Sequence, residues 1–319
     1  MIRRVAYYWQ RIRTLRRQHS TRHLTRVLWA SLCRHWFFTR FAWHWLEFYL
    51  FAPHRSALRT VRRAVLGEVP VPSDDHAPIH LLFYASFDRA SAVGEHVSAQ
   101  LRAHHEAGFH IVFVTTSTEF DAQAEAAVRP YCMAAIHRKN IGIDFGSWKA
   151  GYEWLMGTPG GPACLHRANT VLLANDSCYG PFHSMLPSWT QMRNAPNAVY
   201  GITRSLEIRP YLQSYYLHFG TEVVARGLFR EFMTRHVRLL ATKDAVARFL
   251  EVGGSAFLER RGVPLMALID AAEEPARGIL KKHQLLDPIR DPAGREFLEM
   301  GLTPFHKRSN TLHDPSRAQ

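Results

Sequence analysis

The chain has 319 residues, 47% of them hydrophobic and 21% charged, which is typical of a soluble globular protein with a sizeable core. Its four cysteines show neither a CxxC pair nor zinc-like spacing, which argues against a disulfide framework and a structural metal and fits a reducing compartment. The net charge of +13 resembles that of a nucleic-acid binder, but residues 1–66 hold 14 arginines against one acidic residue. The remaining 26 basic and 26 acidic residues balance, so the body of the chain is neutral.

Residues 1–66 are predicted to form a basic, tryptophan-rich helical segment. Arg34, Arg40 and Glu47 interrupt its apolar run over 27–52, so it is not expected to span a bilayer. No secretory signal is predicted, because no apolar core leads to a small-residue cleavage site. Arginine with tryptophan is typical of a headgroup boundary, where each basic residue contributes on the order of 1 kcal/mol. We expect docking on the inner, cytoplasmic face of the cell membrane; a protein partner or the protein's own body is the alternative, and nucleic acid comes behind both.

The next segments predict an α/β fold. Residues 67–78 contain three prolines and are interpreted as a linker. The domain that follows, expected over 79–270, begins with alternating strands and helices, which is typical of a doubly wound parallel sheet. These predicted elements are a strand over 79–85, a helix over 92–107, a strand over 109–115, a helix over 121–128 and a strand over 133–137.

The later part of the chain predicts a mixed sheet. Residues 212–219 form a strongly β-prone run, and helical patterns flank it. Residues 271–319 are expected to form a polar, partly helical tail that packs on the domain.

Two segments carry the chemistry. In the first, 138–149, a glycine-bearing loop opens a helix, with Asp144 as its expected cap and backbone N–H groups that suit a phosphate. In the second, 171–181, an apolar strand ends at Asn175 and Asp176 before a turn. Ligands in open α/β sheets lie beyond the carboxyl ends of the strands, so Asp176 is placed to meet a metal or a ligand. Together the segments predict a sugar-nucleotide site.

From about residue 79 to residue 308 the chain resembles the rhamnan synthesis F family of glycosyltransferase-like proteins. The resemblance implies the nucleotide-sugar-binding glycosyltransferase A-type fold. It is carried by eight pieces in order: Phe83–Asp88, Val112–Val114, Asn140–Lys149, Asn175–Pro181, Gly201–Thr203, Leu212–Tyr215, Glu251–Gly253 and Pro304–Arg308.

The resemblance implies roles at a donor site. The donor would be a nucleotide-diphosphate sugar, with Asp88 near its base or ribose and a loop wrapping the nucleotide. Asp176 would bind Mg²⁺ or Mn²⁺ bridging the diphosphate. Because the triplet Asn-Asp-Ser offers only one carboxylate to a metal, basic side chains would take over part of the neutralisation of the diphosphate charge. The other residues assigned to the donor are Asn140, Gly142, Asp144, Lys149 and Asn175, with Lys307 and Arg308 on phosphate and Arg138 as a further candidate.

For the acceptor, the resemblance implies that Glu251 opens a helix and acts as general base. Gln213, Ser214 and Tyr215 would contact the acceptor sugar. Structural alternatives stay open: Asp144 and Asp176 as caps, Asp88 as a turn residue, Lys149 as a surface lysine, Glu251 as a first-turn glutamate.

The sequence therefore predicts a membrane-associated, inverting glycosyltransferase, with rhamnose as the sugar that the family name implies. Its acceptor would be a surface polysaccharide or a lipid-linked glycan. A scaffold protein that keeps the fold without transfer is the main alternative. His306, Leu250 and the pair Gly254–Ser255 depart from the family pattern, and they affect the acceptor side more than the donor side.

Overall fold

The computed structural model describes residues 42–52, 55–66, 69, 78–89 and 93–308. It divides into two compact units, Met1–Pro53 and His54–Gln319. In the first unit, residues 42–51 are helical, and Glu47–Phe51 form the π-helical turn η1. Within the described parts of the chain, no helix is both long and apolar enough to cross a membrane.

The second unit is built on a nine-stranded mixed sheet whose order is β1-β4-β3-β2-β5-β9-β7-β10, with β8 paired to β7. Strands β4, β3, β2 and β5 are parallel, β1 is antiparallel to β4, and β9 is antiparallel to both β5 and β7. The bounds are β1 Val61–Leu66, β2 Ile79–Ser86, β3 Phe109–Thr115, β4 Cys132–Arg138, β5 Ala168–Asn175, β7 Val199–Ser205, β8 Tyr211–Leu212, β9 Tyr216–Phe219 and β10 Leu265–Asp270.

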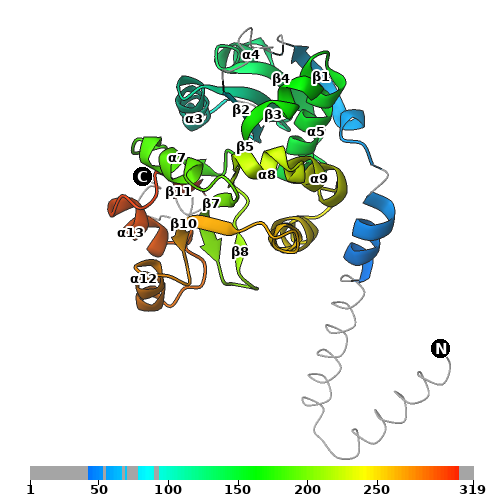
Figure 1. Cartoon of the computed structure of the whole chain (residues 1–319). Helices are drawn as coiled ribbons and strands as arrows, with labels where there is room; N and C mark the ends of the chain where they lie inside the picture. Colours follow the sequence, from blue (N-terminus) through cyan, green and yellow to red (C-terminus); the bar gives the residue numbers. More distant parts are fainter. Residues whose placement is uncertain (1–41, 53–54, 67–68, 70–77, 90–92, 309–319) are drawn as a thin grey trace, which may run out of the picture. The chain divides into compact units, whose positions relative to one another are not determined.

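Helices cover both faces of this sheet, with α3 and α7 on one side and α5 and α9 on the other (Figure 1). The helical bounds are η3 Leu58–Thr60, α3 Glu95–Glu106, α4 Ala122–Val128, α5 Ile143–Gly157, α6 Gly161–His166, α7 Leu186–Arg193, α8 Thr221–Ala225, α9 Leu228–Glu231, η4 Phe232–His236, α10 Lys243–Ala245, η5 Val246–Val252, α11 Gly253–Glu259, α12 Ala276–His283 and α13 Ala293–Glu299.

The core lies around the central strands, which are buried on both faces and therefore read as nearly continuous apolar runs. On one face, Tyr84 and Phe113 pack with Leu101 of α3 and Trp189 of α7. On the other face, Gly151 lets α5 approach the sheet closely, since a Cβ at this position would lie only 2.9 Å from the ring of Phe83. The predicted alternation of strands and helices over residues 79–137 is confirmed, and the sheet is mixed but mostly parallel.

Three expectations are corrected. Residues 61–66 were predicted to be helical, but they form β1, because Val61–Leu66 pairs with the exposed edge of β4. The β-prone run over 212–219 is interrupted at 213–215, where the chain turns between β8 and β9. Asp144 does not cap α5; the cap residue is Gly142, at φ 84°, and no side chain bonds the helix end there.

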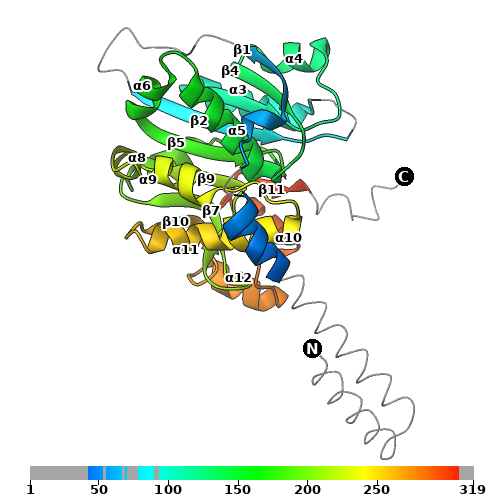
Figure 2. The ribbon, with the colours of Figure 1, turned by 90° about the vertical axis from the view of Figure 1, so that its right-hand side faces the viewer.

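The C-terminal region returns to the sheet. Helices α12 and α13 pack through Ile279, Leu280 and Phe297 against Ile269 of β10. Figures 1 and 2 both show α12 at the end of the sheet opposite β1. The chain then forms β11, His306–Lys307, which pairs antiparallel with β6, Cys178–Tyr179, next to the tip of β5. This pairing brings residues 306–308 to the carboxyl edge of the parallel strands. Most of the predicted linker over 67–78 lies outside the described residues.

Candidate functional site

Asp176 lies at the carboxyl edge of the sheet, directly after β5. Strands β2 and β5 are parallel neighbours, so the end of β2 meets Asp176 there. Its Oδ2 accepts hydrogen bonds from the N–H of Phe87 at 2.9 Å, the hydroxyl of Ser86 at 3.2 Å and Nη1 of Arg308 at 3.4 Å. Burial raises the pKa of Asp176, while the Phe87 hydrogen bond and the charge of Arg308 oppose that rise.

The loop before α5 brings Asp144 to the same edge. Gly142 adopts a left-handed conformation, and a Cβ at Gly146 would overlap the carbonyl oxygen of Ile141, so both positions require glycine. The resulting turn places Oδ2 of Asp144 2.8 Å from Nδ2 of Asn175, which donates the hydrogen bond. Asn175 is thereby held at the tip of β5.

Glu251 completes a group of three carboxyl side chains. Burial raises the pKa of Asp144 to about 7, and the negative charges of Asp176 and Glu251 add to this rise, while Lys307 opposes it. Burial also raises the pKa of Glu251, and the charge of Lys307 lowers it. Asp144 therefore feels the charges of Asp176, Glu251 and Lys307, and Glu251 also feels the charge of Lys307. We call these four residues the edge cluster.

Glu251 is not a helix-opening residue. It lies in η5, and the backbone continues in helical conformation into α11, so the first-turn interpretation is wrong. Its Oε1 accepts a hydrogen bond from the N–H of Ser214 at 2.6 Å. That bond ties η5 to the 213–215 turn.

Lys307 and Arg308 arrive from the far end of the chain. Nζ of Lys307 donates to Oγ of Ser177 at 3.3 Å and lies 5.6 Å from the ring centre of Tyr215. Arg308 is anchored by its own N–H, which donates to the carbonyl of Ser177 at 2.9 Å. Its guanidinium bridges two acids, since Nη2 lies 3.4 Å from Asp88 and Nη1 3.4 Å from Asp176. Asp88 thus joins the edge through an ion pair.

The three residues assigned to the acceptor have partners inside the protein. Oε1 of Gln213 accepts from Thr203 at 2.6 Å, and its Nε2 donates to Asp287 at 2.9 Å. Thr203 also donates to the hydroxyl of Tyr215 at 3.1 Å. The N–H of Ser214 holds Glu251. These side chains lie near the edge cluster, but Gln213 and Tyr215 are buried and serve to position the turn.

Other predicted residues lie elsewhere. Lys149 is buried, and its Nζ donates to the carbonyl of Met233 at 2.8 Å and lies 3.7 Å from Glu153, so it does not face the edge cluster. Arg138 is fully buried and donates to Thr60 and Ser147, so it organises the loop from inside. Asn140 is exposed on the loop.

Several contributing residues were missed in the sequence. Ser86 and Ser177 bond to members of the site, and serines at strand ends are too common to signal this. His96, in the first turn of α3, contacts the ring of Tyr179 at 5.1 Å, and its buried Nε2 has no hydrogen-bond partner in the described part of the chain. Asp287 holds Gln213 from the C-terminal region. Only the tertiary fold brings these residues together.

The residues at Asp176 do not suit the expected divalent cation. One oxygen of this carboxylate, Oδ2, already receives an N–H, a hydroxyl and a guanidinium. A cation there would also meet the positive charge of Arg308. Among residues 42–308 that the structure describes, no group of three or more His, Cys, Asp or Glu side chains is arranged to hold a metal ion.

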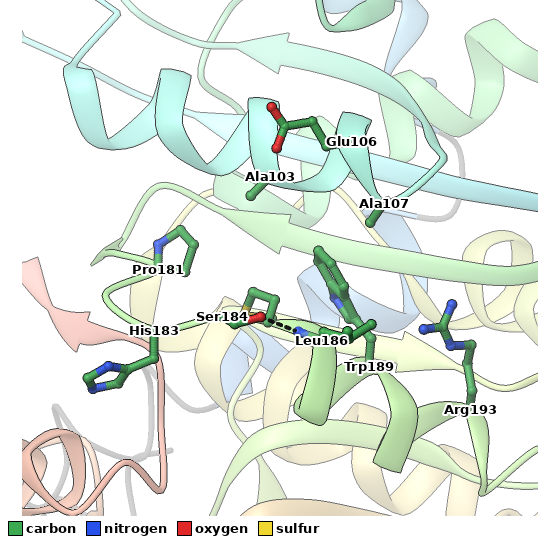
Figure 3. Close-up of a pocket in the computed structure, with 10 residues that line it drawn as sticks. Ala103, Glu106, Ala107, Pro181, His183, Ser184, Leu186, Trp189 and Arg193 are labelled. Carbon is green, nitrogen blue, oxygen red and sulfur yellow. Dashed lines mark hydrogen bonds between the residues drawn. The ribbon is translucent and has the colours of Figure 1, made fainter.

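A separate pocket of about 460 Å³ lies between α3, the segment 181–186 and α7. Figure 3 shows Glu106 on its α3 side and Trp189 and Arg193 on its α7 side. None of the residues predicted for the site lines it, so this pocket is distinct from the edge cluster.

The chain is similar to curated proteins over part of its length. The uncharacterized protein y4gN of Sinorhizobium fredii is 27% identical over 130 residues, covering 38% of this chain and 31% of that protein. Virulence protein VirA of Vibrio anguillarum is 29% identical over 101 residues, covering 32% and 30%. The chain therefore spans about a third of the length of these curated relatives.

Among solved structures, the bifunctional glycosyltransferase WbbM matches with 12% identity and a TM-score of 0.32, over 58% of this chain and 39% of that one. The glycosyltransferase GlyE of Streptococcus pneumoniae TIGR4 matches with 11% identity and a TM-score of 0.30, over 76% and 66%. The family model for rhamnan synthesis protein F matches residues 111–290. Since this match covers more than half of the chain and includes β5, Asp144, Asp176 and Glu251, the protein belongs to the rhamnan synthesis protein F family.

Proposed function

We propose that this protein is a glycosyltransferase of the A-type fold that moves a sugar from a nucleotide-diphosphate donor to a surface polysaccharide or a lipid-linked glycan. The observation that carries the proposal is the edge cluster: Asp144, held at the carboxyl edge of the parallel strands by Asn175, feels the charges of two carboxyl groups and a lysine from distant parts of the chain. In open α/β sheets this edge is where ligands bind. Family membership adds polysaccharide synthesis, and rhamnose is the donor sugar that the family name suggests.

The donor would bind along the loop of 140–146 and the tip of β5. Asp88, Asp144 and Asn175 would receive the nucleoside and sugar hydroxyls. The left-handed backbone of Gly142 shapes the loop, and Asn140 is exposed on it. Lys307 and Arg308 supply the positive charge that a diphosphate needs. Lys149 has no part in this proposal, because its ammonium group is bonded to Met233.

Glu251 would act as general base in an inverting reaction. The acceptor hydroxyl oxygen attacks the anomeric carbon and gives its proton to the Glu251 carboxylate. The bond between that carbon and the diphosphate oxygen breaks, and the oxygen leaves with the electron pair, facing Lys307 and Arg308. The raised pKa of Glu251 makes it a stronger base than an exposed glutamate. A positioned base contributes about 10²–10⁴-fold.

One observation favours a scaffold protein as the second candidate. Gln213 and Tyr215 are buried and bonded to Thr203, so they offer little to an acceptor sugar. A protein that binds a nucleotide sugar without transferring it would need only the donor half of the site.

We further propose that the first unit docks on an anionic membrane surface. On the helix over 42–51, His44 and Glu47 are buried, whereas large apolar side chains are exposed, which reverses the usual pattern of a helix in water. Ten of the fourteen arginines of residues 1–66 belong to this unit, and they complement an anionic leaflet. The exposed apolar residues are Trp43, Trp45, Leu46, Tyr49 and Leu50.

The proposed function is tested with a panel of sugar nucleotides in a thermal-shift assay, with and without Mg²⁺ or Mn²⁺, followed by a transfer assay with the stabilising donor. Stabilisation by one nucleotide class with release of its nucleoside diphosphate supports the transferase. Stabilisation without turnover on any polysaccharide or lipid-linked acceptor supports the scaffold. Stabilisation by none of the donors contradicts both.

A further inference from the structure

Arg308 occupies the position where a diphosphate-bound cation would be expected. Its guanidinium lies between Asp88 and Asp176, 3.4 Å from an oxygen of each. Both acids follow parallel strands of the sheet, β2 and β5, which are adjacent. The arginine backbone is held by its hydrogen bond to Ser177 and by the pairing of β11 with β6. The charge is therefore placed by the fold and not by a freely rotating surface side chain.

A divalent cation bound by the Asp176 carboxylate would lie close to this guanidinium, whose Nη1 is 3.4 Å from Oδ2. Two positive charges at one carboxylate repel strongly in a partly buried site. The side chain of Asp176 is only 11% exposed, while that of Arg308 is 28% exposed, so the arginine is the partner that faces solvent. A ligand phosphate arriving from solvent meets the guanidinium first.

Lys307 provides a second charge beside it. Its Nζ bonds to Ser177 at 3.3 Å, on the residue that also anchors the Arg308 backbone. An ammonium and a guanidinium on consecutive residues together match the charge of a divalent cation. A guanidinium group can also bind two phosphate oxygens at once through its paired N–H donors.

We propose that Arg308, together with Lys307, replaces the divalent cation at the donor diphosphate, so that the protein binds a nucleoside diphosphate without metal. This inference rests on the proposed function and adds to it that the C-terminal residues 306–308 are part of the donor site. Arg308 acts directly on the leaving group, whereas Asp88 and Asp176 position its guanidinium.

The test is isothermal titration of the full chain with UDP, GDP and dTDP, each in EDTA and in Mg²⁺. We expect the preferred nucleotide to bind with the same affinity, within about twofold, in both conditions. Arg308→Ala should weaken binding in EDTA about tenfold or more, as expected for a lost bond to a charged group. Mg²⁺ should restore part of that affinity, because the variant leaves room for a cation at Asp176. A purely structural role of Arg308 would not produce this rescue.

Arg295→Gln, at an exposed arginine of α13, is the matched control and should bind as the unaltered chain does. If Arg308→Ala does not fold, nucleotide titration of Arg308→Lys replaces it. The comparison of EDTA with Mg²⁺ on the unaltered chain still tests whether binding needs a metal. Binding that requires Mg²⁺ in the unaltered chain overturns the inference and leaves the proposed function standing. Cation-independent binding that Arg308→Ala does not weaken overturns the role of Arg308. Binding of no nucleotide in either condition overturns the inference and the proposed function together.

Discussion

Nδ2 of Asn175 donates a hydrogen bond to Oδ2 of Asp144 at 2.8 Å, although 31 residues separate the two in sequence. This bond joins the first turn of α5 to the tip of β5, and so connects the glycine-bearing loop to the strand end that carries Asp176. Burial raises the pKa of Asp144 to about 7, so the proton on this carboxyl responds to pH near neutrality.

Stability should fall as pH rises toward 7, and Asp144→Asn should reduce that fall. With a folded-state pKa above the ordinary value, the folded protein binds more protons than the unfolded chain between about pH 4 and pH 7. For one extra bound proton, the free energy of unfolding falls by up to about 1.4 kcal/mol for each unit by which the pH rises across that window. Asn mimics the protonated form and keeps an acceptor for Asn175. Urea unfolding at pH 5 and pH 8 measures how the free energy of unfolding changes with pH, and Glu299→Gln on the exposed side of α13 is the control. An equal change in Asp144→Asn and the unaltered chain would contradict the raised pKa of Asp144.

Glu251→Gln should lower the turnover of sugar transfer by two or more orders of magnitude, because glutamine cannot take the acceptor proton. Donor affinity should stay within about twofold, since the amide oxygen can still accept the Ser214 N–H bond. Steady-state kinetics with donor titration separates the two effects. Glu222→Gln, at an exposed position of α8, is the control, and unchanged turnover in the Glu251 variant removes Glu251 from the mechanism.

Lys149→Met should destabilise the protein by about 1–3 kcal/mol, because the buried carbonyl of Met233 loses its charged donor. Donor affinity should not change, since the ammonium group does not face the edge cluster. Thermal unfolding and nucleotide titration measure the two quantities, and Lys281→Met on the exposed side of α12 serves for comparison. A loss of affinity with intact stability would restore Lys149 as a phosphate ligand.

Gly146→Ala should destabilise the protein by about 1–3 kcal/mol and weaken donor binding, because the added Cβ overlaps the Ile141 carbonyl and lies 3.1 Å from the Arg138 guanidinium. The loop must shift, and Asp144 shifts with it. Gly157→Ala in the last turn of α5 is the matched control, since a Cβ there meets no atom within 4 Å and alanine favours helix. Equal stability and donor affinity of the two variants would show that the loop tolerates the side chain.

Replacing Trp43, Trp45 and Tyr49 by serine in the full chain should reduce co-sedimentation with anionic vesicles, because exposed aromatic side chains insert at the headgroup boundary. Binding to neutral vesicles should be weak for both proteins. The control is Phe182→Ser with Leu186→Ser, which removes exposed apolar side chains of the second unit. Equal pelleting of the triple variant and the unaltered chain would contradict membrane docking by this helix.

The central strands of the sheet can be predicted from the amino-acid sequence alone. The runs 79–85 and 109–115 are apolar and rich in aromatic or β-branched residues, which favours buried strands, and the helical pattern between them favours parallel pairing. The sequence also predicts that Asp176 follows a strand and that glycines open the helix α5, because turn-forming residues act locally. The concentration of arginine in residues 1–66 needs no structure to be seen.

Which side chains contact each other depends on the three-dimensional packing of the elements. Residues 61–66 join the sheet as β1 because β4 offers an unpaired edge, which outweighs their own arginine-rich composition. Lys149 pairs with Met233, 84 residues away, and Arg308 reaches Asp176 across 132 residues. Such partners depend on how helices and strands stack over long sequence separations. Local patterns therefore predict the strand end at Asp176, while the packing of the C-terminal strand against β6 determines which charge lies beside it.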